Sequence, residues 1–303
     1  MKQTIYLIKR NCAIFFRDKS TVFFSMLSMF ITLGLMVIFL GKMNSDNLVQ
    51  VLAEFGPRDT AADRVNASYL IQLWTLAGIL ATNSVTVPLT VLGAMVQDET
   101  HKRLMAFYVT PVNRLKLSLG YILSAFFIGT VLCVLTLLFG ELYFMSQGYS
   151  LLGAPAIVEL IGMIALNTLC FSSLGYLLAL FVHSDSAWSG LLTIIGTLVG
   201  FVSGTYLPLG SLGETLQNIL KCLPFLHGAS MMRKICTASA ITKTFDGLPE
   251  IGSEIFSEQM GIRLFHGNEE FTTGIQVSIL LAYAIMTIVL AAILNRNRKL
   301  KDR

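Results

Sequence analysis

Residues 69–96 read YLIQLWTLAGILATNSVTVPLTVLGAMV, a stretch that contains no Asp, Glu, Lys, Arg or His. About 20 consecutive, mostly apolar residues suffice to cross the hydrocarbon core of a bilayer as a helix. A backbone exposed to lipid must satisfy its own hydrogen bonds, so this stretch is predicted to be a transmembrane helix. Five further stretches have the same character, at residues 22–40, 117–140, 160–182, 187–207 and 271–294.

The composition agrees with a chain whose surface mostly faces lipid. Hydrophobic residues make up 54% and charged residues only 13%, whereas soluble domains carry roughly 25% charge. A transmembrane barrel would show short alternating segments, and these are absent from the sequence. We therefore predict an all-α integral membrane protein with six transmembrane helices. The net charge of +4 gives no reason to expect nucleic acid as a partner.

The distribution of Lys and Arg predicts the orientation, because cytoplasmic loops of membrane proteins are enriched in these residues. The N-terminal segment, the loop at 97–116 and the C-terminal tail lie on one side and hold 14 of the 22 basic residues. Both termini are therefore expected in the cytoplasm, and the protein in a plasma or bacterial inner membrane. The opposite side would carry a long loop, residues 208–270, between the fifth and sixth helices.

Residues 1–20 precede the first predicted span and have an amphipathic helical pattern. Apolar residues recur every three or four positions, and polar or basic residues recur every seven positions on another face. The apolar set is Ile5, Ile8, Cys12 and Phe15, and the polar set is Gln3, Arg10 and Arg17. Such a helix lies in the membrane interface and binds anionic lipid headgroups. The alternative is a plain cytoplasmic extension of the first membrane helix.

The loop at 97–116 between the second and third predicted spans has an unusual residue pattern for a cytoplasmic loop. Its acidic start suits a helix N-terminus, and a proline at its end stops that helix. Aromatic residues lie between them at helical spacing, among basic residues, which is typical of a surface that docks onto another protein. A solvated loop helix without function is the alternative. The residues assigned to docking are Asp98, Glu99, Arg103, Leu104, Phe107, Tyr108, Pro111 and Arg114.

The long loop at 208–270 is too apolar in part to be a plain linker. Residues 209–226 mix Leu and Ile with Pro and Gly, which suits short helices that dip back into the membrane interface. Residues 237–270 are more polar and are predicted to form a small folded insertion. The five cysteines are scattered, so free thiols are expected, although Cys222 and Cys236 share this loop and a disulfide between them is left open.

Two of the predicted spans carry small polar residues. Asn83, Ser84 and Thr86 precede Pro88 in the second span. Polar groups at this depth are costly when they face lipid, so they line either a substrate path or an internal helix contact. The fifth span carries a glycine stripe that allows close packing, within the subunit or across a dimer. Its members are Gly196, Gly200 and Gly204, with Thr193 and Thr197 alongside.

The sequence lacks the residues that several functions require. The Gly-rich phosphate loop of ATPases is missing, as is any metal-ligand spacing, so the chain is predicted to have no enzymatic activity of its own. An ion-coupled secondary transporter would need an ionisable residue within a span, and the six spans supply none. Glu141 and Glu159 flank a short outer loop. They either shape the exit of a cationic substrate or mark where two helices leave the lipid.

Four features together resemble the ABC type-2 permease family. They are the interfacial N-terminal helix with Arg17-Asp18 at its exit, the loop with Phe107-Tyr108-Val109-Thr110-Pro111, the Ser203-Gly204 end of the fifth span before Pro208, and the Leu223-Pro224 to Arg233 segment. The resemblance covers nearly the whole of residues 1–303, as a single permease domain. Members often carry Gly-Thr and a Glu in the loop, where this chain has Lys102, Arg103 and Met105.

The resemblance implies six helices per subunit, a dimer with a second copy or a paralogue, and a separate ATP-binding subunit that holds ATP and Mg. The loop at 97–116 would be the coupling helix, and this chain itself would bind no cofactor. The second and fifth spans would line the central route, which assigns Asn83, Ser84, Thr86, Thr193 and Thr197 to the substrate path. The expected function is export of an amphiphilic drug, antibiotic or toxin. Export of a lipid-linked glycan or a lipid is the alternative.

Overall fold

The computed structural model describes all residues except 1, 36–40, 54–58, 104–113, 268 and 298–303. It is 83% helical, with one short antiparallel hairpin. The helices are α1 (Lys2–Arg17), α2 (Lys19–Leu35), α3 (Gly41–Ala53), α4 (Thr60–Thr100), α6 (Arg114–Ser146), α7 (Ala154–Ala179), α8 (Asp185–Val202), η2 (Leu209–Ser211), α9 (Glu214–Lys221), α10 (Pro224–Thr244), α11 (Glu250–Gln259) and α12 (Thr273–Asn297). The hairpin pairs β1 (Phe265–His266) with β2 (Glu269–Glu270).

Five of the described helices are long and apolar enough to cross a membrane, namely α4, α6, α7, α8 and α12. They confirm five of the predicted spans and a multi-pass membrane protein. The remaining predicted span, at 22–40, extends into residues that are not described. Its first part forms α2, which ends at Leu35 within the described residues. The sixth span therefore stays a prediction, as does the orientation in the membrane.

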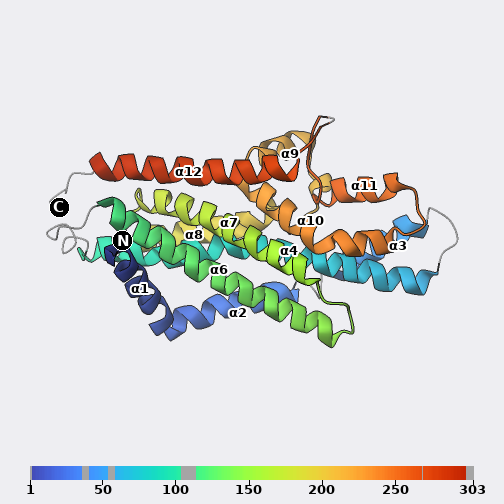
Figure 1. Cartoon of the computed structure of the whole chain (residues 1–303), viewed down its shortest axis with the longest axis horizontal. Coiled ribbons are helices and arrows are strands. Elements are labelled where there is room, and N and C mark those ends of the chain that lie inside the picture. The colour runs from blue at the N-terminus through green and yellow to red at the C-terminus, as the bar shows by residue number, and fades with distance from the viewer. Residues whose placement is uncertain (1, 36–40, 54–58, 104–113, 268, 298–303) are drawn as a thin grey trace.

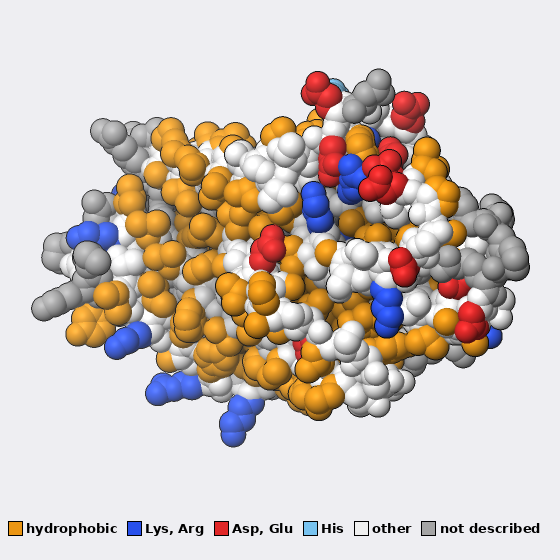
Figure 2. All heavy atoms as spheres, turned by 45° about the vertical axis from the view of Figure 1, so that its right-hand side comes forward, with side chains coloured by type: hydrophobic (Ala, Val, Ile, Leu, Met, Phe, Trp, Pro, Cys, Tyr) orange, Lys and Arg blue, Asp and Glu red, His pale blue; other side chains and the backbone are white. Residues whose placement is uncertain are grey.

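The helices run roughly along one long axis and define two ends (Figure 1). The start of α1, the end of α4, the start of α6 and the end of α12 lie at one end, called here the terminal end. Helices α3 and α11 lie at the opposite, far end (Figure 1). On the face drawn in Figure 2, carboxylates lie mostly toward the far end and a broad apolar belt lies between the two ends. Such a belt suits a surface in contact with lipid.

Helix α4 is the central helix and contacts α3, α6, α7, α8 and α10. Small residues on its neighbours allow the backbones to approach closely. A Cβ on Gly140 of α6 would lie 2.6 Å from a methyl carbon of Leu76, and one on Gly129 would lie 2.9 Å from the Pro88 ring. Small residues at helix contacts are how membrane helices pack without a hydrophobic driving force. The core of the protein therefore surrounds α4.

Local sequence accounts for several helix boundaries. The carboxylate of Asp59 accepts hydrogen bonds from the backbone N–H groups of Ala61 and Ala62 and caps the start of α4. The hydroxyl of Ser184 caps α8 in the same way. Proline occupies the first turn of both α7 and α10, where its missing N–H costs nothing.

The segment 208–270 contains more structure than the sequence predicts. Short helices are present in η2, α9 and α11, but α10 is a helix of 21 residues that packs against α4 and α7. Whether any of these helices dips into the membrane stays a prediction. The hairpin is an exception to the predicted all-α fold. Cys222 is exposed and Cys236 is buried, and both are free thiols, so the disulfide left open by the sequence is absent.

The predicted N-terminal helix is present as α1, and its buried face overlaps the predicted apolar face in part, since Phe15 is buried and Ile8 and Cys12 are half-buried. Leu7, Asn11 and Phe15 are buried, whereas Ile5 is exposed. The buried face points at α6, where a Cβ on Gly120 would lie 2.8 Å from the Leu7 Cβ. Helix α1 is thus held against another helix of the same chain, and this contact selects its buried face.

Candidate functional site: the terminal-end network and the α4–α8 surface

Asp98, near the end of α4, is the centre of a buried polar cluster. Its side chain is only 2% exposed. Arg10 of α1 forms an ion pair with it, with 2.8 Å between Nη2 and Oδ2. Tyr121 of α6 donates a hydrogen bond to Oδ2 at 2.6 Å, and Arg103 lies 3.7 Å from Oδ1. One carboxylate therefore joins α1, α4 and α6, and charge and hydrogen bonds offset the cost of burying it.

The same cluster fixes the position of α1. Arg10 also donates to Asn11 Oδ1 at 3.1 Å, and Asn11 donates to the Ser124 hydroxyl at 3.2 Å. Burial alone would lower the pKa of Arg10, but the hydrogen bond and charge of Asp98 outweigh it and raise the pKa above its ordinary value. Arg10 is therefore a permanent cation in this contact.

A second network ties α6, α7 and α12 together at the terminal end. Asn295 of α12 donates to the Ser118 hydroxyl at 2.8 Å and to the Tyr176 hydroxyl at 3.0 Å. Tyr176 in turn donates to Ser118 at 2.9 Å. Arg114 donates to the Asn295 carbonyl at 3.0 Å. The start of α6, next to the predicted docking loop, is thus connected to two further helices.

The predicted docking residues fall into three groups. Leu104, Phe107, Tyr108 and Pro111 lie outside the described residues. Asp98 and Arg114 make the internal contacts above, so their side chains brace the two ends of the loop. Arg103 is 60% exposed, and Glu99 lies 3.2 Å from His183 Nδ1 in the turn between α7 and α8. Arg103 is therefore the most accessible of the docking residues that the structure describes, whereas the Glu99 side chain is only 22% exposed.

Sequence reasoning missed the residues that complete these networks. Ser118, Tyr121 and Tyr176 lie inside charge-free stretches, and Asn295 directly follows the stretch at 271–294. None of the four matches a motif. Arg10 was assigned to a lipid-binding face. A charged side chain near the end of a span needs a partner, and that requirement is the signal that could have suggested a search for the partner of Asp98.

One face of α4 carries polar side chains along most of its length. They recur at helical spacing, at Gln72, Thr75, Thr82, Asn83, Thr86, Thr90 and Gln97. Toward the terminal end this face is open, since Thr90 and Gln97 are exposed. Toward the far end it is covered. Thr86 and Thr90 each donate to the carbonyl four residues earlier, at 3.2 and 3.0 Å, so their hydroxyl protons are satisfied within the helix.

The predicted path residue Ser84 lies elsewhere. It is fully buried between α4 and α7, where Asn167 donates to its hydroxyl at 2.6 Å. This position corresponds to the internal packing that the sequence left open. Asn83 is also buried, and its amide nitrogen has no hydrogen-bond acceptor among the described residues. Only Thr86 of the three predicted α4 residues approaches the open surface.

Helix α8 presents hydroxyl groups on the outside of the bundle. Ser189, Thr193 and Thr197 are exposed, and each donates to the carbonyl four residues earlier. From Leu281 onward the exposed residues of α12 are instead apolar, including Ile285, Val289 and Ile293. Lipid accounts for the surface of α12, whereas the hydroxyl-bearing surface of α8 suits water or another protein.

The glycines of the fifth predicted span do not form one packing stripe. Gly196 has open space where a Cβ would be. Gly200 is covered by the ring of Tyr206, which folds back from the segment after α8. Gly204 lies beyond the end of α8 at φ +66°, in a turn that a residue with a side chain rarely adopts. Of these three glycines, Gly196 remains available for contact with another helix.

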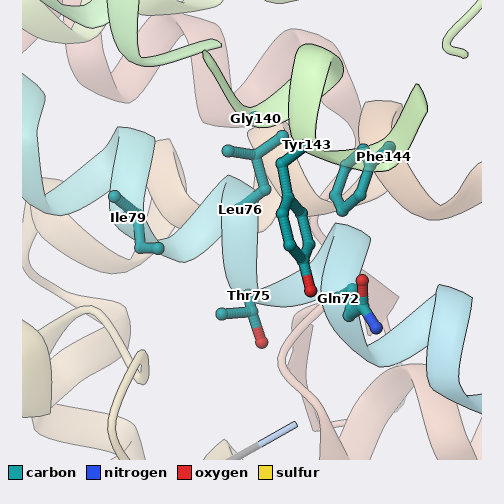
Figure 3. A pocket seen from close by; sticks show the side chains of 7 residues that line it. All are labelled: Gln72, Thr75, Leu76, Ile79, Gly140, Tyr143 and Phe144. Carbon is teal, nitrogen blue, oxygen red and sulfur yellow. The ribbon is translucent and has the colours of Figure 1, made fainter. Parts of the chain in front are cut away.

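A small cavity lies in the covered part of the polar face of α4 (Figure 3). Gln72, Thr75 and Ile79 of α4 line it together with Tyr143 and Phe144 of α6. Its volume of about 10 Å³ has room for about one water molecule. Gln72 Oε1 and Thr75 Oγ1 are buried without a hydrogen-bond partner in the described structure. The Tyr143 ring is directed from α6 toward these two residues (Figure 3).

The fold and these surfaces define a multi-pass membrane protein without a recognisable catalytic centre among its described residues, where no group of His, Cys, Asp and Glu could hold a metal ion. Residues 57–294 match the family described as ABC-2 family transporter protein. The match covers well over half of the chain, so the protein belongs to this family, whose members are membrane subunits of transporters that work with an ATP-binding partner. No curated protein matches the sequence.

Proposed function

We propose that the chain is the membrane subunit of an ATP-driven exporter of amphiphilic compounds, and that the surface of α4 and α8 lines the export path. The observation that supports this most strongly is the line of exposed hydroxyl groups on α8, a helix long and apolar enough to span the membrane. Exposed Ile194, Leu198 and Phe201 lie among the hydroxyls. A surface that mixes both kinds of side chain suits an amphiphilic substrate.

The path would be completed by a second copy of the chain or by a paralogue. Polar groups on a spanning helix are costly against lipid and favourable against another helix. The open space at Gly196 would let a partner helix approach α8 closely. The water-sized cavity between α4 and α6 would then mark the closed far end of the route, because Gln72 and Thr75, the last members of the polar face in that direction, line it.

Coupling would run through the terminal-end network. The ATP-binding partner, which would hold ATP and Mg, is proposed to contact the loop at 97–116 on the cytoplasmic side. The cluster at Asp98 would transmit movement of that loop to α1, α4 and α6 together. This subunit would itself bind no nucleotide and would hydrolyse no ATP.

Disulfide crosslinking in native membranes tests the path. Thr193→Cys and Thr197→Cys are expected to crosslink two copies in the presence of a mild oxidant, because these positions would face the partner. Ile285→Cys on α12, which is 61% exposed, is the matched control and is expected to stay monomeric. Equal crosslinking at both helices, or crosslinking at Ile285 alone, would contradict the proposed interface.

Purification tests whether a separate subunit supplies the ATP hydrolysis. The chain isolated from its native membranes is expected to bring down an ATP-binding subunit, and ATP hydrolysis is expected only while that subunit is present. Hydrolysis by the purified chain alone, or a preparation that transports in the absence of any ATPase, would be incompatible with the proposal. Retention of a glycolipid through purification, in place of stimulation by amphiphilic amines, would favour the lipid-linked glycan alternative.

A further inference from the structure

A groove of about 320 Å³ lies between the far-end halves of α6 and α7. Leu138, Leu142 and Met145 of α6 line one side, and Ile157 and Ile161 of α7 line the other. Its volume is at the lower end of the range for ligand pockets, about 300–1,000 Å³. It lies on the side of α6 opposite Tyr143, and therefore away from the cavity of Figure 3.

Glu141 is the acidic residue in this otherwise apolar lining. Its side chain is 9% exposed. Oε2 accepts a hydrogen bond from the backbone N–H of Leu152 at 3.0 Å, whereas Oε1 is buried and has no partner in the described structure. An ionised carboxylate in an apolar site is costly unless a cation accompanies it. No Lys, Arg or His among the described residues forms an ion pair with Glu141.

The groove lies where lipid headgroups meet lipid chains. Tyr69, at which the charge-free stretch of α4 begins, donates a hydrogen bond to the carbonyl of Ser150 at 2.5 Å. The segment that joins α6 to α7 is therefore level with the boundary of that stretch. Leu138, Leu142 and Met145 are exposed beside the groove, so its opening faces the bilayer. A lipid already has access to it.

We propose that the groove binds a phospholipid whose headgroup carries a primary ammonium, in the leaflet at the far end. The ammonium would pair with Glu141, and one acyl chain would lie along Leu138, Ile157 and Ile161. A carboxylate at the depth of the headgroups selects for a cationic headgroup, and the apolar walls select for the chain. This site is separate from the α4–α8 surface, so it does not depend on the proposed transport path.

Native mass spectrometry of the full chain tests the assignment. The protein is released from nanodiscs that contain equal amounts of phosphatidylethanolamine, phosphatidylcholine and phosphatidylglycerol, and the retained lipids are counted. Phosphatidylethanolamine is expected to be enriched at least threefold over the other two. Glu141→Gln is expected to abolish this enrichment, while its amide oxygen still accepts the Leu152 N–H. Glu159→Gln, at an exposed carboxylate of α7, is the matched control and is expected to retain it.

A second variant tests the contacts of the acyl chain separately from those of the headgroup. Ile161→Trp would fill the groove and is expected to reduce retention of all three lipids, with an unchanged elution profile as evidence of folding. Equal retention of the three lipids by the natural chain would overturn the proposal. So would an equal loss in the Glu141→Gln and Glu159→Gln variants. A third outcome would overturn the assignment as well: the retained lipid is fully displaced by dodecylamine but not by added phosphatidylethanolamine. The ligand of the groove would then be a free amphiphilic amine and not a phospholipid.

Discussion

Asp98 shows how one residue can serve coupling without touching a partner. Its carboxylate is enclosed by Arg10, Tyr121 and Arg103, which come from α1, from α6 and from the segment that follows α4. Its position at the start of the predicted docking loop suggested a surface residue. Its burial instead makes it the point at which a movement of the loop would reach three elements. The role of Asp98 in coupling stays a prediction. Its burial suggests that it would act by holding these elements in position, and not by contacting the partner.

Asp98→Asn is expected to destabilise the protein by about 2 kcal/mol, because Arg10 and Tyr121 would lose a charged acceptor. Solvent at the partly exposed Arg10 keeps the loss below that of a fully buried pair. The apparent melting temperature in detergent measures the effect. Glu159→Gln should leave it unchanged. An Arg10→Gln, Asp98→Asn double variant should lose less than the sum of the two single variants, and strict additivity would show that the pair is not coupled.

Arg233 is fully buried in α10, and no Asp or Glu among the residues that the structure describes forms an ion pair with it. It donates to the carbonyls of Ser203 and Gly204 after the end of α8, at 3.0 and 2.8 Å, and lies over the Trp74 ring at 4.6 Å. Burial lowers its pKa to about 9, so the guanidinium remains charged at neutral pH. The end of a helix favours such a cation. Arg233 therefore anchors α10 to the turn that ends α8.

Arg233→Met is expected to cost about 3 kcal/mol of unfolding free energy, because buried carbonyls would lose their donors. Arg263→Met provides a matched comparison, since Arg263 forms partly exposed ion pairs with Glu254 and Glu270. Exposed pairs contribute about 1 kcal/mol or less. Thermal unfolding of both variants would rank them. A larger loss for Arg263→Met than for Arg233→Met would show that the buried contacts at the end of α8 contribute little.

At the level of elements, the charge-free stretches located five spans well. The stretch at 117–140 lies within α6, and the stretch at 271–294 corresponds to α12. Helix α8 ends at Val202, short of the predicted 207, because the chain turns at Gly204. Helix α10 was not predicted, since its periodicity is weak and its burial depends on α4 and α7. Local sequence cannot report packing against a helix more than a hundred residues away.

The close contact between α7 and α10 predicts that one methyl group added at Gly228 lowers the stability of the protein. A Cβ on Gly228 would overlap the side chain of Asn167, which is already held by Ser84. Gly228→Ala is therefore expected to push the two helices apart and to lower the melting temperature by several degrees. Gly162→Ala in α7 is the matched control, because open space surrounds it. That variant should be neutral or slightly stabilising; equal losses would refute the packing explanation.

The candidate site was predictable only where it depends on local pattern. The acidic start of the loop at 97–116 and the hydroxyls of the fifth span are visible in the sequence. The contact between Arg10 and Asp98 joins residues that are 88 positions apart. The hydrogen bond between Ser118 and Asn295 joins residues that are 177 positions apart. No spacing rule connects such pairs. The burial of Ser84 against Asn167 favours the internal helix contact over the path. The sequence alone could not choose between the two, because a polar residue in a span indicates a polar partner but not which helix supplies it.

At the scale of the whole molecule, the two ends differ in charge and predict the orientation. Cys222 is exposed near the start of α10, on the side expected to face outward. A membrane-impermeant maleimide should therefore label it in intact cells, and Cys222→Ser should abolish the signal. A fluorescent protein fused to the C-terminus should fold and fluoresce in the cytoplasm. Labelling only after the cells are broken, with a dark fusion, would reverse the predicted topology.

The length of α4 has a mechanical consequence. Its 41 residues make a rod of about 60 Å, roughly twice the thickness of the hydrocarbon core. One end of this rod holds Asp98 and the other contacts α3. A rod that pivots inside the membrane converts a small displacement at one aqueous face into a displacement at the other, without a relay of loops. Pro88, about two thirds of the way along the helix, removes one backbone hydrogen bond and so offers a place for the pivot.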